Sequence, residues 1–274
     1  MDVKRANRHF DILFVLVLAL AMPASSWAQD SDQESQNQQE TQLGAQTFND
    51  LKSQGVIVKS SPLYDTLRPI ESAIVRVVQP QYPLPIHFYI VHGNEPNAFA
   101  APGGNVYVID AMLYFVRNRE ELAGTLCHET SHLIHHDSVH EMDHDEAVRR
   151  REIIGSILLG GDLGTVLAAS TIGDLDSMHY SRGAEEAADL KGADTCAEAG
   201  LNPWGLVWLF QDFNASNMKT PPEILSDHPD NAHRIEGLEA HFKADPARFS
   251  KFNSDPKAAT TLKLPKNKAE VFLQ

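Results

Sequence analysis

Apolar residues recur every three or four positions between Leu63 and Val78, and this spacing places them on one face of an α-helix. The prolines at positions 80, 83 and 85 end that helix, because proline cannot donate a backbone hydrogen bond. Apolar periodicity also predicts helices over residues 119–137, 181–199 and 204–213. The folded part of the chain is therefore expected to be mainly α-helical.

Two short segments favour an extended backbone instead. Residues 86–91 follow the prolines, and residues 105–110 include the run Val106-Tyr107-Val108-Ile109 after a Pro-Gly-Gly turn. We expect these strands to form a small β-sheet beside the helix of residues 119–137, in an α+β fold. If the strand of residues 105–110 lies at the sheet edge, its backbone can hold an extended peptide by strand addition; a buried strand is the alternative.

The two ends of the chain differ from this core. Residues 1–28 combine a basic start, an apolar run and the small-x-small string Ser26-Trp27-Ala28, which is typical of a secretory signal peptide. A membrane anchor is the alternative, but the run is about half of the ~20 residues that a span needs. Residues 29–46 contain few large apolar side chains and predict a disordered polar tether. Residues 246–274 are weakly patterned and predict a C-terminal surface tail.

Composition narrows the classes of function. The 274 residues include 23 Lys and Arg and 37 Asp and Glu, so the net charge is −14, and such an acidic chain repels nucleic acid. Two cysteines are too few for a disulfide framework or a four-cysteine zinc site. Thirteen histidines, in contrast, are a generous supply of metal-binding imidazole.

The string His128-Glu129-Thr130-Ser131-His132 lies within the longest predicted helix. Histidines four residues apart project from the same helix face and can reach one Zn²⁺, while Glu129 can accept a proton from a metal-bound water. A second match, His140-Glu141-Met142-Asp143-His144, carries an extra acid and precedes two more. Because a catalytic helix is buried, we interpret the second match as a solvated polar region.

Catalytic zinc usually has three protein ligands, so another should exist elsewhere in the chain. The candidate lies within residues 180–189, at the start of the helix of residues 181–199. Glu185 and Asp189 are one turn apart there and share a face, whereas Glu186 points about 100° away.

These residues resemble peptidase family M48, a family of gluzincin zinc metallopeptidases. The resemblance rests on ordered motifs between residues 97 and 235: Asn97-Ala98-Phe99-Ala100 with Pro102-Gly103-Gly104, Glu121-Leu122-Ala123-Gly124 leading into His128 to His132, Ser181-Arg182 with Glu185 and Asp189, and Ser226-Asp227-His228-Pro229 with Arg234-Ile235. It implies a zincin-like metallopeptidase domain over residues 47–245 that binds one Zn²⁺ per chain.

The resemblance also implies roles for individual residues. His128, His132 and Glu185 would hold the zinc ion, and Asp189 would orient a zinc-binding histidine. His228 would approach the metal, either to stabilise the oxyanion as a catalytic residue or to occupy the fourth zinc position and keep the enzyme latent. Separately, Arg182 is expected to pair with a carboxylate and fix the start of its helix.

The resulting expectation is a periplasmic zinc metalloendopeptidase, free or peripherally bound at the outer membrane. Its substrates would be polypeptides, namely unfolded or misassembled cell-envelope proteins. The alternative is a catalytically silent or latent zinc-containing chaperone or assembly factor, although a structural zinc site does not need a base such as Glu129. A membrane-embedded enzyme would require residues 153–172 to insert, but their four glycines favour a buried helical hairpin.

The two cysteines are predicted to be buried thiols. Cys127 precedes the first histidine, and Cys196 lies about 16 Å of helix beyond Glu185. If the two helices meet at zinc, the cysteines are too far apart for a disulfide, whose Cα atoms are at most about 6.8 Å apart.

Overall fold

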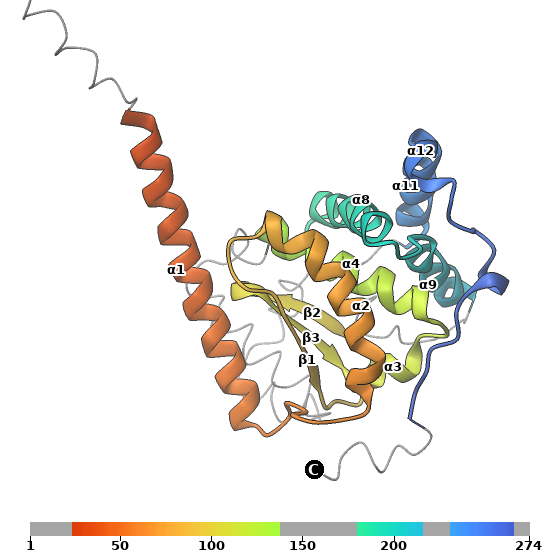
Figure 1. The fold of residues 1–274 in the computed structure, drawn as a ribbon, viewed down its shortest axis with the longest axis horizontal. Coiled ribbons are helices and arrows are strands. Elements are labelled where there is room, and N and C mark those ends of the chain that lie inside the picture. Colours follow the sequence, from red (N-terminus) through yellow and green to blue (C-terminus); the bar gives the residue numbers. More distant parts are fainter. Residues whose placement is uncertain (1–23, 138–179, 216–230, 266–274) are drawn as a thin grey trace, which may run out of the picture. The chain divides into compact units, whose positions relative to one another are not determined.

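A computed structural model of the chain describes residues 24–137, 180–215 and 231–265 (Figure 1). By its internal contacts the chain divides into residues 1–39 and residues 40–274. The first helix, α1 (Ala24–Ser53), begins in the first unit and ends in the second. The other elements all belong to the second unit: α2 (Leu63–Val78), β1 (His87–Val91), β2 (Ala98–Ala101), β3 (Asn105–Ile109), α3 (Asp110–Phe115), α4 (Arg119–Ile134), α8 (Arg182–Ala199), α9 (Trp204–Ala215), α11 (Asn231–Ala244), α12 (Pro246–Phe249), and the short 3-10 turns Gln79–Gln81, Pro102–Gly104 and Pro256–Ala258.

The three strands form one sheet in the order β1-β3-β2. β3 pairs with β1 in parallel and with β2 antiparallel, and all five β3 residues are buried. Of the two alternatives for residues 105–110, the buried strand is therefore the one observed, and side chains that are mostly apolar on both faces suit a central strand. The edge strand next to the helix α4 is β2 instead.

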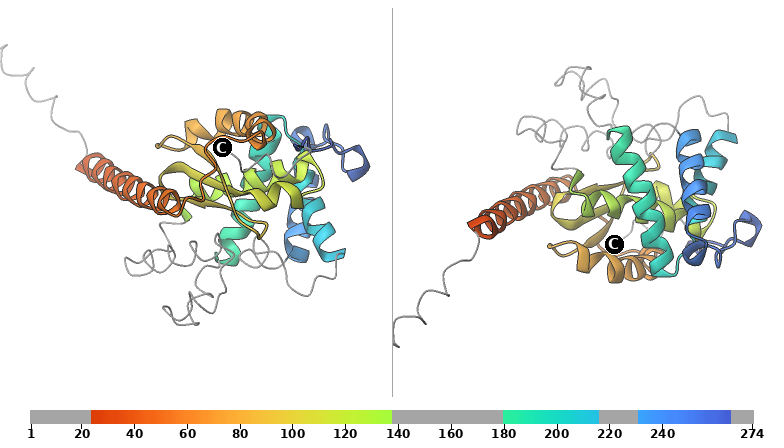
Figure 2. Two further views of the ribbon diagram at one scale, coloured as in Figure 1. Left: turned by 90° about the horizontal axis from the view of Figure 1, so that it is seen from below. Right: turned by 90° about the horizontal axis from the view of Figure 1, so that it is seen from above.

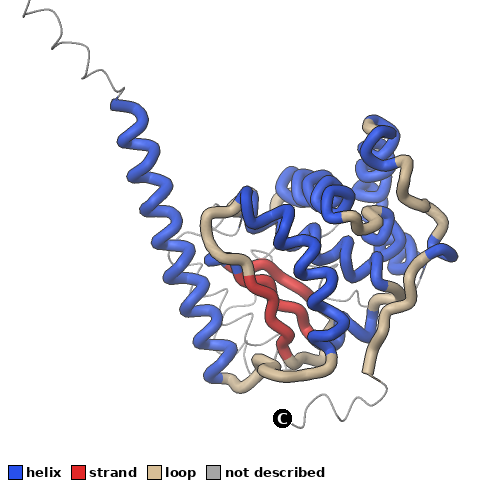
Figure 3. Tube along the Cα trace, viewed as in Figure 1, coloured by secondary structure: helices blue, strands red, loops and turns tan. Residues whose placement is uncertain are grey.

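The two faces of the sheet belong to different hydrophobic clusters, and in Figure 3 the helix α2 crosses in front of the strands. On one face Phe88, Ile90 and Val108 join the main hydrophobic core with α2 and α4. The other face carries an aromatic row, in which the ring of Tyr107 stacks on Tyr89 at 5.7 Å and on Phe99 at 5.1 Å between centroids. The fold is thus mainly helical with a small sheet beside α4, as the sequence predicts.

Helix α8 packs against α4, and α9 and α11 lie side by side in both views of Figure 2. Within the described residues, no helix is both long and apolar enough to span a membrane. The apolar segment of residues 153–172 lies outside the described residues, as does most of the predicted signal peptide.

Residues 29–46, predicted to be a disordered tether, lie in α1. The helix docks through Glu40, Gly44, Thr47 and Leu51, which are spaced along one face and buried. A side chain at Gly44 would place its Cβ 2.3 Å from the carbonyl oxygen of Pro102, so only glycine fits at this contact without a shift of the backbone. Three of these four buried residues are polar or small. The scarcity of large apolar side chains in the sequence therefore does not reveal that this helix has a buried face.

The predicted surface tail also packs in part against the domain. Phe249 is buried in the main core, and the backbone N–H of Thr260 donates to the carboxylate of Glu120 at 2.8 Å. Phe249 is the only buried residue among residues 246–265, and residues 266–274 lie outside the described part.

Candidate metal centre

Helix α4 passes through the interior of the domain, and every residue from Glu120 to Leu133 is buried. Its start is capped by Asn118, whose side chain accepts the N–H of Glu121 at 2.8 Å, while the Glu121 carboxylate accepts the N–H of Arg117 at 2.7 Å. Inside the helix, the hydroxyl of Ser131 donates to the carbonyl of Cys127 at 2.8 Å. Such bonds satisfy the polar side chains that the buried helix carries.

Helix α8 approaches α4 closely at a glycine. A Cβ added at Gly192 would lie 3.0 Å from both the Cα and the N of His128, so the two backbones are in contact there. The start of α8 is fixed by Ser181, whose hydroxyl accepts the N–H of Ala184 at 3.2 Å. This arrangement turns Glu185 and Asp189 toward the histidines of α4.

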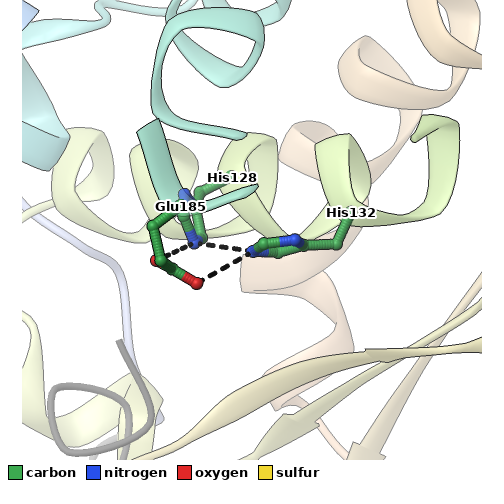
Figure 4. A group of neighbouring side chains, drawn as sticks. All are labelled: His128, His132 and Glu185. Atoms are coloured by element: carbon green, nitrogen blue, oxygen red, sulfur yellow. Dashed lines mark hydrogen bonds and ion pairs between the residues drawn. The ribbon is translucent and has the colours of Figure 1, made fainter. Parts of the chain in front are cut away.

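The structure brings His128, His132 and Glu185 together (Figure 4). His128 Nε2 lies 3.1 Å from His132 Nε2 and 3.5 Å from Glu185 Oε2, and His132 Nε2 lies 3.6 Å from Glu185 Oε1. Donor atoms about 2.0 to 2.1 Å from a tetrahedral Zn²⁺ are about 3.3 to 3.4 Å apart, so these spacings fit one ion. All three side chains are buried.

Glu129 lies between this cluster and the edge of the sheet. Its side chain is buried, and Oε2 accepts the backbone N–H of Ala100 in β2 at 3.2 Å. The carboxylate that follows the first histidine is therefore held beside the edge strand.

Each histidine of the cluster has a carboxylate on its other ring nitrogen. Asp189 Oδ1 lies 3.0 Å from His128 Nδ1, and Asp137 Oδ2 lies 2.7 Å from His132 Nδ1. A carboxylate at Nδ1 holds the N–H there and leaves the Nε2 lone pair for a metal. Sequence reasoning named Asp189 but missed Asp137, for which the available signal was an acid at the predicted end of the histidine helix.

Arg234 of α11 joins the carboxylates of the site and is itself buried. Its guanidinium lies 3.1 Å from Glu185 Oε2 and 4.4 Å from the centroid of the Phe210 ring. Burial by itself lowers the pKa of Arg234, but the charge and hydrogen bonds of Asp189, with the charges of Glu185 and Glu129, outweigh burial and raise it. A permanent cation thus balances the acidic side chains; the sequence placed Arg234 in a motif without giving it a role.

Other predicted residues lie away from the cluster or outside the described residues. Arg182 is exposed at the start of α8, and no ion pair of Arg182 is found within the described residues. It lines a cavity of about 520 Å³ between α8 and α11, which also touches Glu185 and Arg234. His228 and the second histidine string, residues 140–144, lie outside the described residues.

The two cysteines form a disulfide, so the prediction of buried thiols is wrong. Cys127 of α4 and Cys196 of α8 have Cα atoms 5.9 Å apart. The prediction measured the distance along α8 from Glu185, whereas the helices come closest at Gly192, one turn before Cys196. The long Glu185 side chain reaches the histidines from a more distant point on α8.

Comparison with known proteins agrees with this geometry. Residues 68–241 match the family model of peptidase family M48. A beta-barrel assembly-enhancing protease of Yersinia pestis is 30% identical over 159 residues, which cover 53% of this chain and 32% of that protein. The protein of the same name from Escherichia coli K12 is 25% identical over 201 residues, which cover 70% of this chain and 41% of that protein. The mitochondrial metalloendopeptidase OMA1 of Schizosaccharomyces pombe is 27% identical over 153 residues, which cover 55% of this chain and 45% of that protein. In each case the match spans less than half the length of the relative.

Proposed function

Because this chain belongs to peptidase family M48, we propose that it is a zinc-dependent metalloendopeptidase that hydrolyses peptide bonds of unfolded or misassembled cell-envelope proteins. The observation that carries the proposal is the buried convergence of His128, His132 and Glu185 beside Glu129. Two imidazoles and one glutamate are a known ligand set of catalytic zinc, and a carboxylate next to the first ligand is the general base of such enzymes.

The residues of the chain divide the chemistry among them. His128, His132 and Glu185 would hold Zn²⁺, which when bound polarises the scissile carbonyl and acidifies a water molecule. Glu129 accepts the proton of the attacking water and delivers it to the leaving amine. The Ala100 N–H, bonded to Oε2 at 3.2 Å, holds the carboxylate in place for both transfers.

Substrate binding is assigned to the edge strand β2. β2 pairs with β3 on one side, and its residue Ala100 contacts Glu129, so an extended peptide added along the other side would lie next to the base. Strand addition reads the peptide backbone more than its side chains, which suits unfolded substrates. The names of the bacterial relatives, which refer to beta-barrel assembly, support substrates among envelope proteins.

Localisation to the periplasm, free or peripheral at the outer membrane, is part of the proposal. The signal-like residues 1–28 support it, and so does the Cys127–Cys196 disulfide, because disulfides persist in oxidising compartments.

His228 is assigned to the oxyanion, or to a fourth ligand position in a latent enzyme. His228→Ala separates the two roles: casein hydrolysis falls in the first case and rises in the second.

The decisive experiment measures zinc content and casein hydrolysis of the same preparations. The wild type should carry about one zinc per chain and cleave denatured casein in a chelator-sensitive reaction. Glu129→Gln should retain the zinc and lose at least about a hundredfold in rate, because the general base is removed. Glu198→Gln, an exposed change near the other end of α8, serves as the matched control and should leave both unchanged.

A zinc-loaded wild type that binds unfolded protein without cleaving it would replace the enzyme with the chaperone alternative. Full activity in Glu129→Gln would instead remove Glu129 from the mechanism.

A further inference from the structure

The helix that carries the two histidines ends in a strained turn. α4 ends at Ile134, His135 follows as its cap, and His136 has a φ of +56°. Within the described residues, His136 is the only residue other than glycine with a positive φ. Helices commonly carry glycine at this place because the left-handed backbone crowds a Cβ atom. Something in the fold must therefore hold this histidine in the turn.

The turn determines where Asp137 lies. In a continuous α-helix, residues five apart are separated by about 140° around the axis, so an uninterrupted α4 would carry Asp137 away from His132. The left-handed residue between them reverses the backbone, and Asp137 Oδ2 reaches His132 Nδ1 at 2.7 Å. The hydrogen bond to this histidine of the candidate metal site thus depends on the backbone of His136.

A buried carboxylate from α1 contacts the strained residue. Glu40 is 1% exposed and accepts hydrogen bonds from His136 Nδ1 and from the hydroxyl of Tyr82. Burial, and then the hydrogen bond to Glu40, raise the pKa of Tyr82, so its hydroxyl keeps the proton that it donates. The backbone of α1 is close to the turn Pro102–Gly104 between β2 and β3, since a Cβ at Gly103 would lie 2.8 Å from the carbonyl oxygen of Glu40.

We propose that Glu40 is a remote positioning residue of the metal centre. By bonding the His136 imidazole it keeps His136 in the left-handed turn, which keeps Asp137 on His132 and so holds His132 Nε2 toward the metal. The inference rests on the proposed function only in that the cluster binds a metal ion. It makes the second half of α1 a working part of the peptidase domain.

The sharpest test compares two replacements at one position in the full chain, His136→Ala and His136→Gly. Both remove the imidazole that bonds Glu40, but only glycine adopts the left-handed turn without strain. We expect His136→Ala to weaken Zn²⁺ binding about 10- to 100-fold, as loss of an outer partner of a metal ligand does. His136→Gly should bind within about threefold of the wild type. The dissociation constant is measured by competition with a chromogenic chelator, and the ligand geometry by the visible spectrum of the Co²⁺ form.

Glu40 itself is tested in the same assay. Glu40→Gln should lose metal affinity about as much as His136→Ala, again 10- to 100-fold, and adding His136→Gly should restore it. Asp137→Asn should also lose metal affinity. Adding His136→Gly should not restore it, because this change alters the group that bonds His132 and leaves the turn as it is.

The outcomes separate this inference from a purely structural role of α1. Equal affinity of His136→Ala and His136→Gly would overturn it, even if Glu40→Gln failed to fold. A Glu40→Gln protein that melts earlier but binds metal as the wild type does would also overturn it, because Glu40 would then only attach α1. A wild type that binds no zinc would overturn the proposed function instead.

Discussion

Arg234 donates two hydrogen bonds to Asp189, from Nε at 2.7 Å and from Nη2 at 2.6 Å. Both side chains are buried, and Asp189 also contacts His128. The bidentate pair fixes the plane of the carboxylate, and the carboxylate in turn fixes the imidazole. Two residues 45 apart in sequence thereby orient one side chain of the candidate metal site.

Replacing Arg234 by Met should therefore be severe. The change leaves Asp189 buried without its cation, which typically costs about 3 to 5 kcal/mol of the free energy of unfolding. Arg248→Met is the control, because Arg248 pairs with Asp194 at the surface and such pairs contribute about 0 to 1 kcal/mol. Urea unfolding of the two variants measures the difference, and equal losses would contradict the assigned role of Arg234.

The disulfide predicts a mass two hydrogens below that of the reduced chain under non-reducing conditions. Cys127→Ala with Cys196→Ala should lower the free energy of unfolding by about 2 to 4 kcal/mol, because the crosslink restricts the unfolded chain. Guanidinium unfolding of the wild type with and without a reductant should reproduce the difference. Quantitative alkylation of both cysteines in the unreduced, denatured protein would show that the bond is not formed.

Gly192→Ala should push α8 away from α4. The added Cβ would meet the His128 backbone at 3.0 Å, and an overpacked contact of this kind typically costs about 1 to 3 kcal/mol. Gly237→Ala in α11 is the matched control, since a Cβ there has nothing within 4 Å and alanine favours the helix. Measured by thermal unfolding, the melting temperature should therefore fall for Gly192→Ala and not for Gly237→Ala. The zinc affinity of Gly192→Ala should also fall.

Glu121 predicts a pH dependence of stability. Burial, opposed in part by hydrogen bonds from the Arg117 backbone and Asn118, raises the pKa of this carboxyl in the folded protein. A raised folded pKa means that the folded state holds the proton more tightly, so this contribution is present below the unfolded pKa and is lost as pH rises through the folded pKa. In urea unfolding between pH 4 and pH 7, the free energy of unfolding of Glu121→Gln should rise relative to that of the wild type as pH increases. A relative decrease would contradict the sign.

Much of the fold is predictable from periodicity and turn chemistry. The helix over Leu63–Val78 is confirmed residue for residue, because its buried face consists of large apolar side chains in an unbroken spacing. The strand of residues 105–110 is confirmed as β3, one residue shorter. Its central position matches the buried alternative, whereas its edge partner β2 was not foreseen, because β2 is a four-residue strand of alanines and one phenylalanine.

The candidate site is predictable where local spacing governs it and unpredictable where distant contacts do. The spacing of His128 and His132 places both on one face, and a motif pointed to Glu185. The roles of Arg234 and Glu40 depend on contacts across 45 and 96 residues of chain, which no local pattern encodes. The pairing of Cys127 with Cys196 depends likewise on where two helices come closest.

The disulfide has a consequence for what happens when another protease cleaves the chain. α4 supplies two side chains of the candidate metal site and α8 supplies the third, and the covalent link between Cys127 and Cys196 joins these helices directly. A single cut anywhere in the chain between residues 137 and 180 would therefore yield a nicked molecule whose halves stay attached, with all three side chains still on one covalent body.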